Sequence, residues 1–268
     1  MRINLSFTLI FIFIVFTACS RVPFSNRKQF RLLPEKSVIQ LSLTTYSDFI
    51  KTHKLSSDQA NTQLVKKVGK KITKAVEELL KEENKLELIK DYKWEFNLVE
   101  ENTPNAWCLP GGKIVVYTGI LPYTKDENGL AVVLGHEVAH AIARHGNERL
   151  SQQLLYQLGA TSLAVAIKDK PDETKKSFMI AFAIAGQVGI LLPYSRLHEK
   201  EADKLGLIFM AKAGYNPKHA VEFWEEMSKI KSNTPVFLRT HPTSKKRIKI
   251  IKKFLPEAMK YYKPNNYE

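Results

Sequence analysis

The residues of this sequence that are best suited to chemistry lie in one short segment, His136-Glu137-Val138-Ala139-His140. A helix advances about 3.6 residues per turn, so histidines four positions apart lie on one face and can bind the same metal ion. Glu137 lies beside the first histidine, where its carboxylate can take a proton from metal-bound water and later give it to a leaving amine. The pattern predicts one Zn²⁺ ion per chain, with His136 and His140 as ligands and Glu137 as general base.

The sequence around this segment supports a buried metal rather than a polar patch on an ordinary helix. Nearly all residues from 131 to 143 other than these three are apolar, which indicates a helix inside the domain. Two imidazoles and a carboxylate are costly to bury unless something compensates them. A metal ion would do so.

A zinc ion in a hydrolytic site takes three protein ligands and keeps one position for water. Candidates for the third ligand follow in YSRLHEKEADKLG (194–206), which contains His198, Glu199, Glu201 and Asp203. Spacing alone does not choose between Glu199 and Glu201. On a helix, Glu199 and Asp203 share a face, whereas Glu201 points away from both.

Three spaced motifs resemble the HtpX and CAAX prenyl protease family of membrane-associated zinc metallopeptidases: LGHEVAHAIARH, SRLHEKEADKLG and RTHPTSKKRI. The likeness is greatest to its soluble branch of periplasmic lipoprotein proteases and mitochondrial stress proteases. It implies that the first carboxylate of an E-x-x-x-D pattern, here Glu199, is the third zinc ligand. Asp203 would then orient a metal-binding histidine.

The same resemblance implies that His241 and, six positions later, Arg247 lie near the site. His241 could stabilise the oxyanion of a tetrahedral intermediate, or fill the fourth position of zinc and keep the resting enzyme closed. The alternative is that His241 simply precedes Pro242 at a helix start. Arg247 could hold a substrate carbonyl or a neighbouring carboxylate.

The segment NAWCLPGGKIVVYTG also matches a family pattern, in which the second strand of the sheet, here Ile114–Thr118, lies along the active-site cleft. A strand edge there could pair with an extended substrate backbone, and Asn105 begins the pattern, so the resemblance makes it a substrate-binding residue. Cys108 takes a position that the family fills with a small or apolar residue. We interpret it as a packing residue rather than a nucleophile.

Residues 1–19 have the features of an export signal: Arg2, an apolar run from Phe7 to Phe16, and small residues ending at Cys19. Phe16-Thr17-Ala18-Cys19 resembles a bacterial lipobox, which predicts that Cys19 is lipidated. The N-terminal lipid would then attach the protein to a membrane, with residues 20–44 as a tether. The expected location is the periplasmic side of the bacterial outer membrane. The alternative is an ordinary signal peptide and a soluble periplasmic protein.

The chain carries a net charge of +14, from 41 basic and 27 acidic residues. Such a surplus can indicate a nucleic acid or an anionic membrane as partner. Export argues against nucleic acid, and lysines interleaved with apolar residues at helical spacing are typical of solvated helix faces. Contact with anionic lipid is a secondary possibility.

The pattern of the remaining chain predicts a single domain over residues 45–268. Alternation in YKWEFNLVE and the run Ile114–Thr118 indicate two strands that pair in a small antiparallel sheet. Helices are expected at 57–84, 130–144, 150–168, 177–192, 199–213, 217–230 and 243–254. Segment 177–192 is apolar enough to raise the question of a membrane span, but a buried or membrane-surface helix fits its length and Gln187 better.

These features predict a mostly helical α+β zincin of the gluzincin type. Its expected function is zinc-dependent hydrolysis of peptide bonds in proteins, and the resemblance implies misfolded or misassembled envelope proteins as substrates. The alternative is a chaperone or assembly factor of the same fold that binds unfolded clients and rarely cleaves them. The sequence does not predict the oligomeric state.

Overall fold

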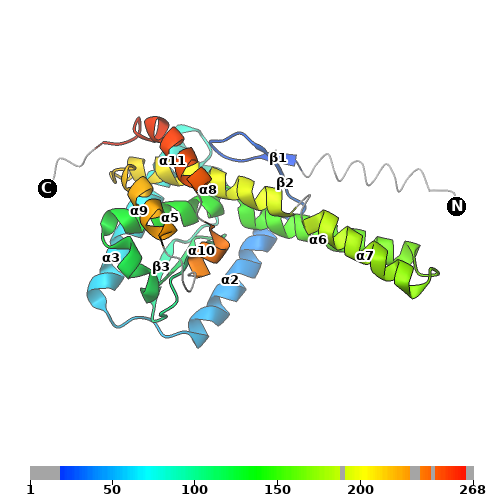
Figure 1. The fold of residues 1–268 in the computed structure, drawn as a ribbon. Coiled ribbons are helices and arrows are strands. Elements are labelled where there is room, and N and C mark those ends of the chain that lie inside the picture. Colours follow the sequence, from blue (N-terminus) through cyan, green and yellow to red (C-terminus); the bar gives the residue numbers. More distant parts are fainter. Residues whose placement is uncertain (1–18, 188–190, 230–235, 243–244, 264–268) are drawn as a thin grey trace. The chain divides into compact units, whose positions relative to one another are not determined.

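The computed structural model describes residues 19–187, 191–229, 236–242 and 245–263 (Figure 1). The chain divides into two compact units: unit 1 comprises Met1–Glu35 and Arg144–His198, and unit 2 comprises Lys36–Ala143 and Glu199–Glu268. Unit 2 contains helices α2 (Glu35–Thr52, less its first residue), α3 (Gln59–Glu82), α4 (Leu121–Thr124), α5 (Glu127–Ile142), most of α8 (Leu192–Lys212), α9 (His219–Ser228), α10 (Val236–Thr240) and α11 (Lys245–Ala258). It also contains two 3₁₀ turns, η1 (Leu86–Ile89) and η2 (Thr118–Ile120).

The sheet of unit 2 has three strands in the order β3-β5-β4, formed by β3 (Glu95–Val99), β4 (Ala106–Leu109) and β5 (Lys113–Tyr117). β4 and β5 are antiparallel, with Trp107 opposite Val115. β3 and β5, the two strands expected from the sequence, are parallel, with Asn97 opposite Val115. The predicted antiparallel pairing of these two strands is therefore wrong, because the short strand β4, which was not predicted, reverses the chain between them.

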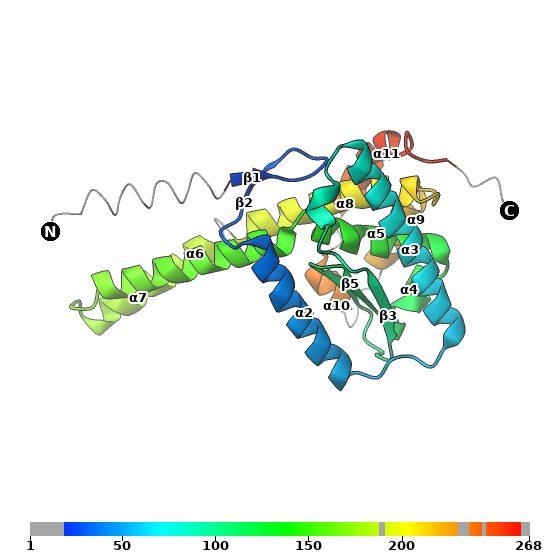
Figure 2. The same cartoon turned by 180° about the vertical axis from the view of Figure 1, so that it is seen from behind.

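Helices cover both faces of this sheet (Figure 2). On one face, Tyr46 of α2 packs against Val99 and Val115. On the other face, Phe96 lies against Gly69 of α3 so closely that a Cβ at position 69 would come within 2.3 Å of the Phe96 ring. Alternate strand residues thus bury against different helices, as the period of a strand requires.

The predicted fold class, a mostly helical α+β domain with a small sheet, is confirmed. The periodic segments fall on α3, α5, α6, α7, α8, α9 and α11, with bounds that differ by up to seven residues. The helix expected from Ser57 begins at Gln59, because the Asp58 carboxylate accepts a hydrogen bond from the backbone N–H of Asn61 at 3.0 Å and caps it.

Unit 1 contains strands β1 (Cys19–Arg21) and β2 (Lys28–Phe30), helices α6 (His145–Ala166) and α7 (Asp172–Gly186), and the start of α8. The two strands form an antiparallel pair, in which Ser20 lies opposite Gln29. The expectation of an irregular tether over residues 20–44 is therefore corrected: this segment contains both strands and the first half of α2. Its cross-strand pairing and buried polar contacts supply the order that its sequence periodicity does not show.

The carboxylate of Glu148 organises the polar interior of unit 1. It is fully buried and accepts hydrogen bonds from both terminal nitrogens of Arg27, at 3.0 and 2.7 Å, and from Gln29 Nε2 at 3.0 Å. His198 Nε2 lies 2.9 Å from the same carboxylate. These contacts hold β2 against α6, and a bidentate arginine supplies the strongest of them.

We expect Glu148→Gln to lower the free energy of unfolding by roughly 3 kcal/mol at pH 7. Burial raises the pKa of Glu148, but the hydrogen bonds from His198, Arg27 and Gln29 outweigh this and lower it to about 2, from 4.5. Since the folded-state pKa lies below the unfolded one, this stabilisation is complete above about pH 4.5 and is lost as the pH falls toward 2. Urea unfolding of wild type and variant between pH 7 and 2.5 measures it.

The exposed Glu173 of α7 provides the matched control, because Glu173→Gln removes a carboxylate from the same unit without removing a buried contact. Its unfolding free energy should stay close to that of the wild type. A difference between wild type and Glu148→Gln that does not shrink at low pH would show that the carboxylate charge is not what stabilises unit 1.

No helix in the described part of the chain is both long and apolar enough to cross a membrane. The segment predicted at 177–192 includes the last two thirds of α7, and residues 188–190 lie outside the described residues. The predicted signal peptide also lies outside them, except that Cys19 begins β1.

Candidate metal centre

Beyond its first two residues, helix α5 carries three polar residues, His136, Glu137 and His140, in an otherwise apolar, buried setting. His136 and Glu137 are 2% and 4% exposed, and thirteen of the sixteen residues of α5 are buried. The apolar side chains make this helix the centre of unit 2, packed on the sheet and on α3 and α9. Residues on such a helix are held in place by its packing, so the histidines are positioned before any ligand binds.

Two glycines let α8 approach α5 at this level. A Cβ on Gly135 would lie 2.9 Å from the carbonyl oxygen of Gly206, and a Cβ on Gly206 would lie 2.9 Å from the backbone nitrogen of His136. Side chains at either position would push the helices apart. The close crossing brings Glu199 and Asp203, both on α8, to the histidines of α5.

Four side chains from three segments converge on one point: His136, His140, Glu199 and His241. His136 Nε2 lies 3.1 Å from both His140 Nε2 and His241 Nδ1. The Glu199 oxygens lie 3.3 Å from His136 Nε2 and from His140 Nε2, and 3.0 Å from His241 Nδ1. His241 follows α10, so the third segment lies more than a hundred positions from α5.

The separations of these four donor atoms suit a tetrahedral metal ion. Zinc bonds of about 2.0–2.1 Å place neighbouring donors about 3.3 Å apart, close to the separations given above, and the four ligand atoms all lie within 4.8 Å of one another. Imidazole nitrogens and a carboxylate oxygen are also the ligand types that zinc prefers in proteins. The donor set therefore fits a zinc ion.

Asp203 and Arg247 lie on the side of His136 that faces away from the donor cluster. The Asp203 carboxylate lies 3.0 Å from His136 Nδ1, on the ring atom opposite the donor cluster. Arg247 of α11 donates to both oxygens of Asp203, at 2.7 and 2.8 Å, and its Nη1 lies 3.3 Å from Glu199 Oε2. A carboxylate behind a histidine fixes its tautomer and orientation, and Arg247 fixes that carboxylate.

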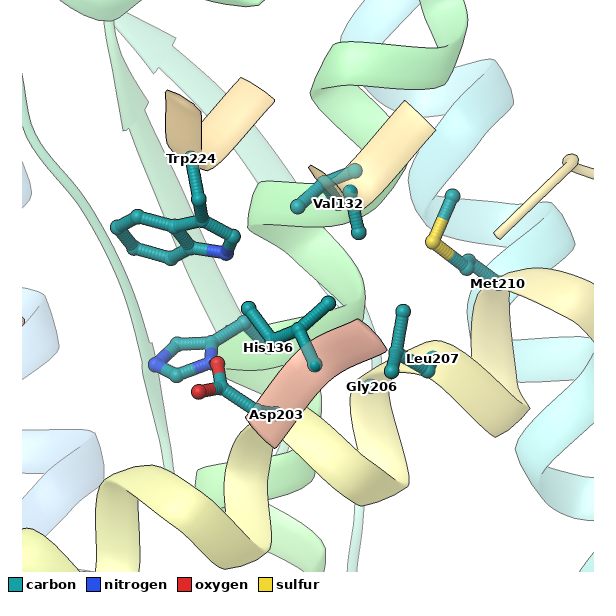
Figure 3. Close-up of a pocket in the computed structure, with 9 residues that line it drawn as sticks. Val132, His136, Asp203, Gly206, Leu207, Met210 and Trp224 are labelled. Carbon is teal, nitrogen blue, oxygen red and sulfur yellow. The ribbon is translucent and has the colours of Figure 1, made fainter. Parts of the chain in front are cut away.

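Figure 3 shows the His136 ring between the Asp203 carboxylate and the indole of Trp224. Trp224 of α9 lies beneath the Arg247 guanidinium, whose central carbon is 3.6 Å from the ring centroid. Beside His136 there remains a cavity of only about 10 Å³, lined by Val132, Met210 and other apolar side chains. Such a space holds one water at most, so the ring has little freedom to turn.

Trp224 was not predicted as a site residue. An aromatic residue in an amphipathic helix is usually a core residue, and its spacing does not indicate a guanidinium partner. Its stacking on Arg247 restricts the arginine that in turn holds Asp203.

Glu137 lies beside the donor cluster but is not part of it. Its Oε1 is buried and accepts no hydrogen bond among the described residues, while His241 Nε2 lies 3.3 Å away without the geometry of one. Burial raises the pKa of Glu137, although the nearby His241 and His136 oppose this. A buried carboxylate oxygen with a free lone pair next to a metal-binding cluster can accept a proton from water.

The two histidines of α5, His136 and His140, differ in the direction in which their pKa values are shifted. Burial lowers the pKa of His140 to about 3, which leaves its imidazole neutral. Burial also lowers the pKa of His136, but the carboxylates of Asp203 and Glu199 outweigh it and raise the value to about 9. Burial raises the pKa of Glu199, yet the three imidazoles hold it well below its usual range, so Glu199 is an anion.

Three predicted residues lie outside the cluster. Asn105 precedes β4, and its backbone carbonyl accepts a hydrogen bond from Tyr117 N at 3.0 Å. Cys108 is buried on β4, and burial together with the Glu137 carboxylate raises the pKa of its thiol well above the usual value, so it is not a thiolate nucleophile. Cys19 belongs to unit 1.

Comparison with known proteins agrees with this geometry. Residues 66–255 match the profile of Peptidase family M48. The chain is 36% identical over 249 residues to mitochondrial metalloendopeptidase OMA1 of Schizosaccharomyces pombe, covering 91% of this chain and 68% of that protein. It is 30% identical over 268 residues to the human metalloendopeptidase OMA1, covering 95% of this chain and 49% of that protein. A β-barrel assembly-enhancing protease of Yersinia pestis is 26% identical over 160 residues, covering 57% of this chain and 32% of that protein.

These comparisons overturn the predicted location. Relatives that match most of the chain are named as mitochondrial proteins in fission yeast, budding yeast and human. The assignment to the periplasmic side of the bacterial outer membrane is therefore wrong. It depended on a short N-terminal pattern, whereas the relatives match most of the chain; lipidation of Cys19 stays an untested prediction.

The family profile covers more than half of the chain, and the members of this family depend on a metal ion, as the convergent histidines and carboxylate suggest. The protein thus belongs to Peptidase family M48 and is a metalloendopeptidase.

Proposed function

We propose that this chain is a zinc-dependent endopeptidase in which His136, His140 and Glu199 hold the metal ion. The convergence of these donors at separations of 3.1–3.3 Å carries the proposal. The set of two histidines and one glutamate is typical of catalytic zinc and leaves one position for water or substrate. Within the family, the 36% identity to the fission yeast protein supports a place in the mitochondrial stress-protease branch.

Zinc, when bound, would supply Lewis acidity to a water molecule and to the scissile carbonyl. Glu137 accepts the proton of that water at its buried Oε1 and passes it to the leaving amine. Burial supports this role, because a raised pKa allows the carboxyl to hold the proton between the two transfers. The Asp203–Arg247 pair keeps Nδ1 of His136 turned away from the donor cluster, so that Nε2 faces it.

For His241, we propose the role of a fourth ligand in this arrangement of the chain. Its Nδ1 lies 3.1 Å from His136 Nε2 and 3.0 Å from Glu199 Oε2, so it would join the residues that hold the metal ion. Hydrolysis needs the fourth position open, so His241 has to move away before water or substrate enters. Once displaced, its imidazole remains near Glu137 and could then stabilise an oxyanion.

We propose that substrates bind in an extended form along β4. β5 is not the pairing strand, because β3 and β4 occupy both of its edges. The outer edge of β3 is also used, by hydrogen bonds from Ser56 N to Leu98 O and from Glu100 N to Lys54 O. Among the described residues, β4 therefore has the sheet edge left for an added strand, and it lies near enough to Glu137 that this carboxylate helps to raise the pKa of Cys108.

Pairing through the backbone gives affinity with little preference for side chains, and it requires a substrate segment without its own secondary structure. We therefore propose misfolded or unfolded polypeptides as substrates, with Asn105 at the start of the binding strand. The expected restriction to envelope proteins depended on the overturned location and is not retained.

A digestion assay with metal removal tests this function. The purified chain should contain one zinc ion and cleave unfolded casein, and chelation should lower cleavage at least about a hundredfold, with recovery after one equivalent of zinc. A compact folded protein of similar size provides the control and should resist. Zinc-loaded chain that binds casein without cleaving it would instead support a chaperone or assembly factor.

A further inference from the structure

Helices α6 and α7 form an antiparallel hairpin in unit 1 (Figures 1 and 2). Its outer surface carries many exposed apolar side chains. The two helices pack on each other through stacked rings of Tyr156 and Phe182, with centroids 5.1 Å apart. Gly186 allows this contact, since a Cβ there would come within 2.2 Å of the Tyr156 ring. The aromatic seam uses the inner faces of both helices and leaves the outer faces exposed.

Seven of the twelve exposed large hydrophobic residues in the described part of the chain lie on this hairpin: Leu154, Leu155, Leu158, Val165, Phe178, Ile180 and Ile184. Val165 and Ile184 are 63% and 59% exposed. Clusters of this kind on a protein surface mark an interaction site.

The exposed residues lie on more than one side of the hairpin. Phe178 and Ile180 are two positions apart, so they point in directions that differ by about 200° around α7, and both are at least half exposed. A flat protein partner would cover one side only. Lipid can contact a helix pair on several sides at once, so the distribution of apolar residues on this hairpin suits lipid better than a protein partner.

The distribution of charge favours the interface of an anionic bilayer. The sequence has no charged residue from 150 to 167 or from 177 to 195, and basic residues bound both runs: Arg149, Lys168, Lys170, Lys175, Lys176 and Arg196. Within 144–198 seven residues are basic and four are acidic, and the whole chain carries +14. Lysines and arginines at the ends of an apolar helix lie at the level of lipid headgroups and are attracted by anionic lipids.

Three hydroxyl side chains of the hairpin also tolerate lipid. The hydroxyls of Thr161 and Ser162 donate to the carbonyl oxygens of Gln157 and Leu158 at 3.0 and 2.9 Å, and Ser177 donates to Glu173 O at 2.9 Å. Hydroxyls bonded within their own helix need no water. The 15-residue α7 is about 22 Å long, shorter than a bilayer core of about 30 Å, so the hairpin fits within the interface rather than across it.

We propose that the α6–α7 hairpin is a membrane-docking element that inserts into the interfacial region of an anionic lipid bilayer. The charged ends stay among the headgroups, and the apolar outer faces contact acyl chains. This role is separate from the metal centre, and it does not depend on the proposed zinc chemistry.

Vesicle flotation of the full chain tests the proposal. Vesicles of phosphatidylcholine with about 30% phosphatidylglycerol should bind the wild type more tightly than vesicles of phosphatidylcholine alone. Ile180→Ser combined with Ile184→Ser should weaken binding roughly tenfold or more. The matched control is Leu41→Ser with Leu86→Ser, which removes two hydrophobic residues of similar exposure from unit 2 and should bind like the wild type.

Hydrogen exchange locates the contact in the same samples. Anionic vesicles should slow exchange of amides in residues 154–166 and 172–186 and leave α3 unchanged. Absence of binding, equal binding by the Ile180/Ile184 variant, or protection confined to residues outside the hairpin would each overturn the proposal. The proposal would also be overturned if the wild type formed a dimer, the Ile180/Ile184 variant were a monomer, and neither bound vesicles. The exposed apolar residues of the hairpin would then contact a second copy of the chain.

Discussion

Replacing Glu137 by glutamine is expected to lower the rate of peptide cleavage by roughly two to four orders of magnitude while the zinc content stays the same. Glutamine has the size and shape of glutamate, so the packing of α5 is kept. Its amide, however, cannot accept the proton of water at the position of Oε1, which is buried and accepts no hydrogen bond among the described residues. Glu137 contributes no atom to the convergent donor set, so metal affinity should change little.

Glu127 at the start of α5 supplies the control. Glu127→Gln makes the same chemical change in the same helix, at a side chain that is 31% exposed and lies beside Lys67. Its cleavage rate should remain near that of the wild type. Measuring kcat and KM for a fluorogenic peptide, with zinc quantified in each sample, separates the two variants. A fully zinc-loaded Glu137→Gln enzyme within tenfold of the wild-type rate would remove Glu137 from its proposed role.

The second large effect is expected at Glu199. Removing its carboxylate with Glu199→Ala should weaken zinc binding by more than roughly a hundredfold. Loss of a residue that only hydrogen-bonds to a metal ligand typically costs about ten- to hundredfold in affinity. The carboxylate lies within 3.3 Å of donor nitrogens of His136, His140 and His241 and stays ionised because of them. Without it, only imidazole nitrogens would be left to hold a divalent ion.

Glu201→Ala is the matched comparison, because it removes a carboxylate two positions away on the same helix. The two side chains differ by about 200° around α8, and Glu201 does not belong to the donor set. Both are buried, at 9% and 7% exposure, so either substitution can destabilise the fold. Zinc titration should therefore be accompanied by circular dichroism. A folded Glu199→Ala chain that retains stoichiometric zinc, or a folded Glu201→Ala chain that loses it, would contradict this assignment.

The choice between Glu199 and Glu201 shows which features of the site the sequence predicts and which only the tertiary structure decides. Helical periodicity is local, so the spacing of His136 and His140, and of Glu199 and Asp203, already placed each pair on one helix face. The apolar run around His136 likewise predicted a buried helix. Spacing alone left the third donor open, because only the crossing of α5 and α8 at Gly135 and Gly206 decides which face of α8 meets the histidines.

What depends on contacts between distant segments was decided by the tertiary structure. The parallel pairing of β3 with β5 follows from β4, a strand of four residues whose pattern is too short to recognise. His241 joins the donor set although a single His-Pro pair has no periodic signal, and the stacking of Trp224 on Arg247 joins residues of two different helices. Periodicity and capping arise from neighbours along the chain, so the sequence by itself determined most helices and the His136–His140 pair. Strand order, the position of His241 and the support of Asp203 by Arg247 depend on which buried surfaces fit together, and that is a property of the folded chain.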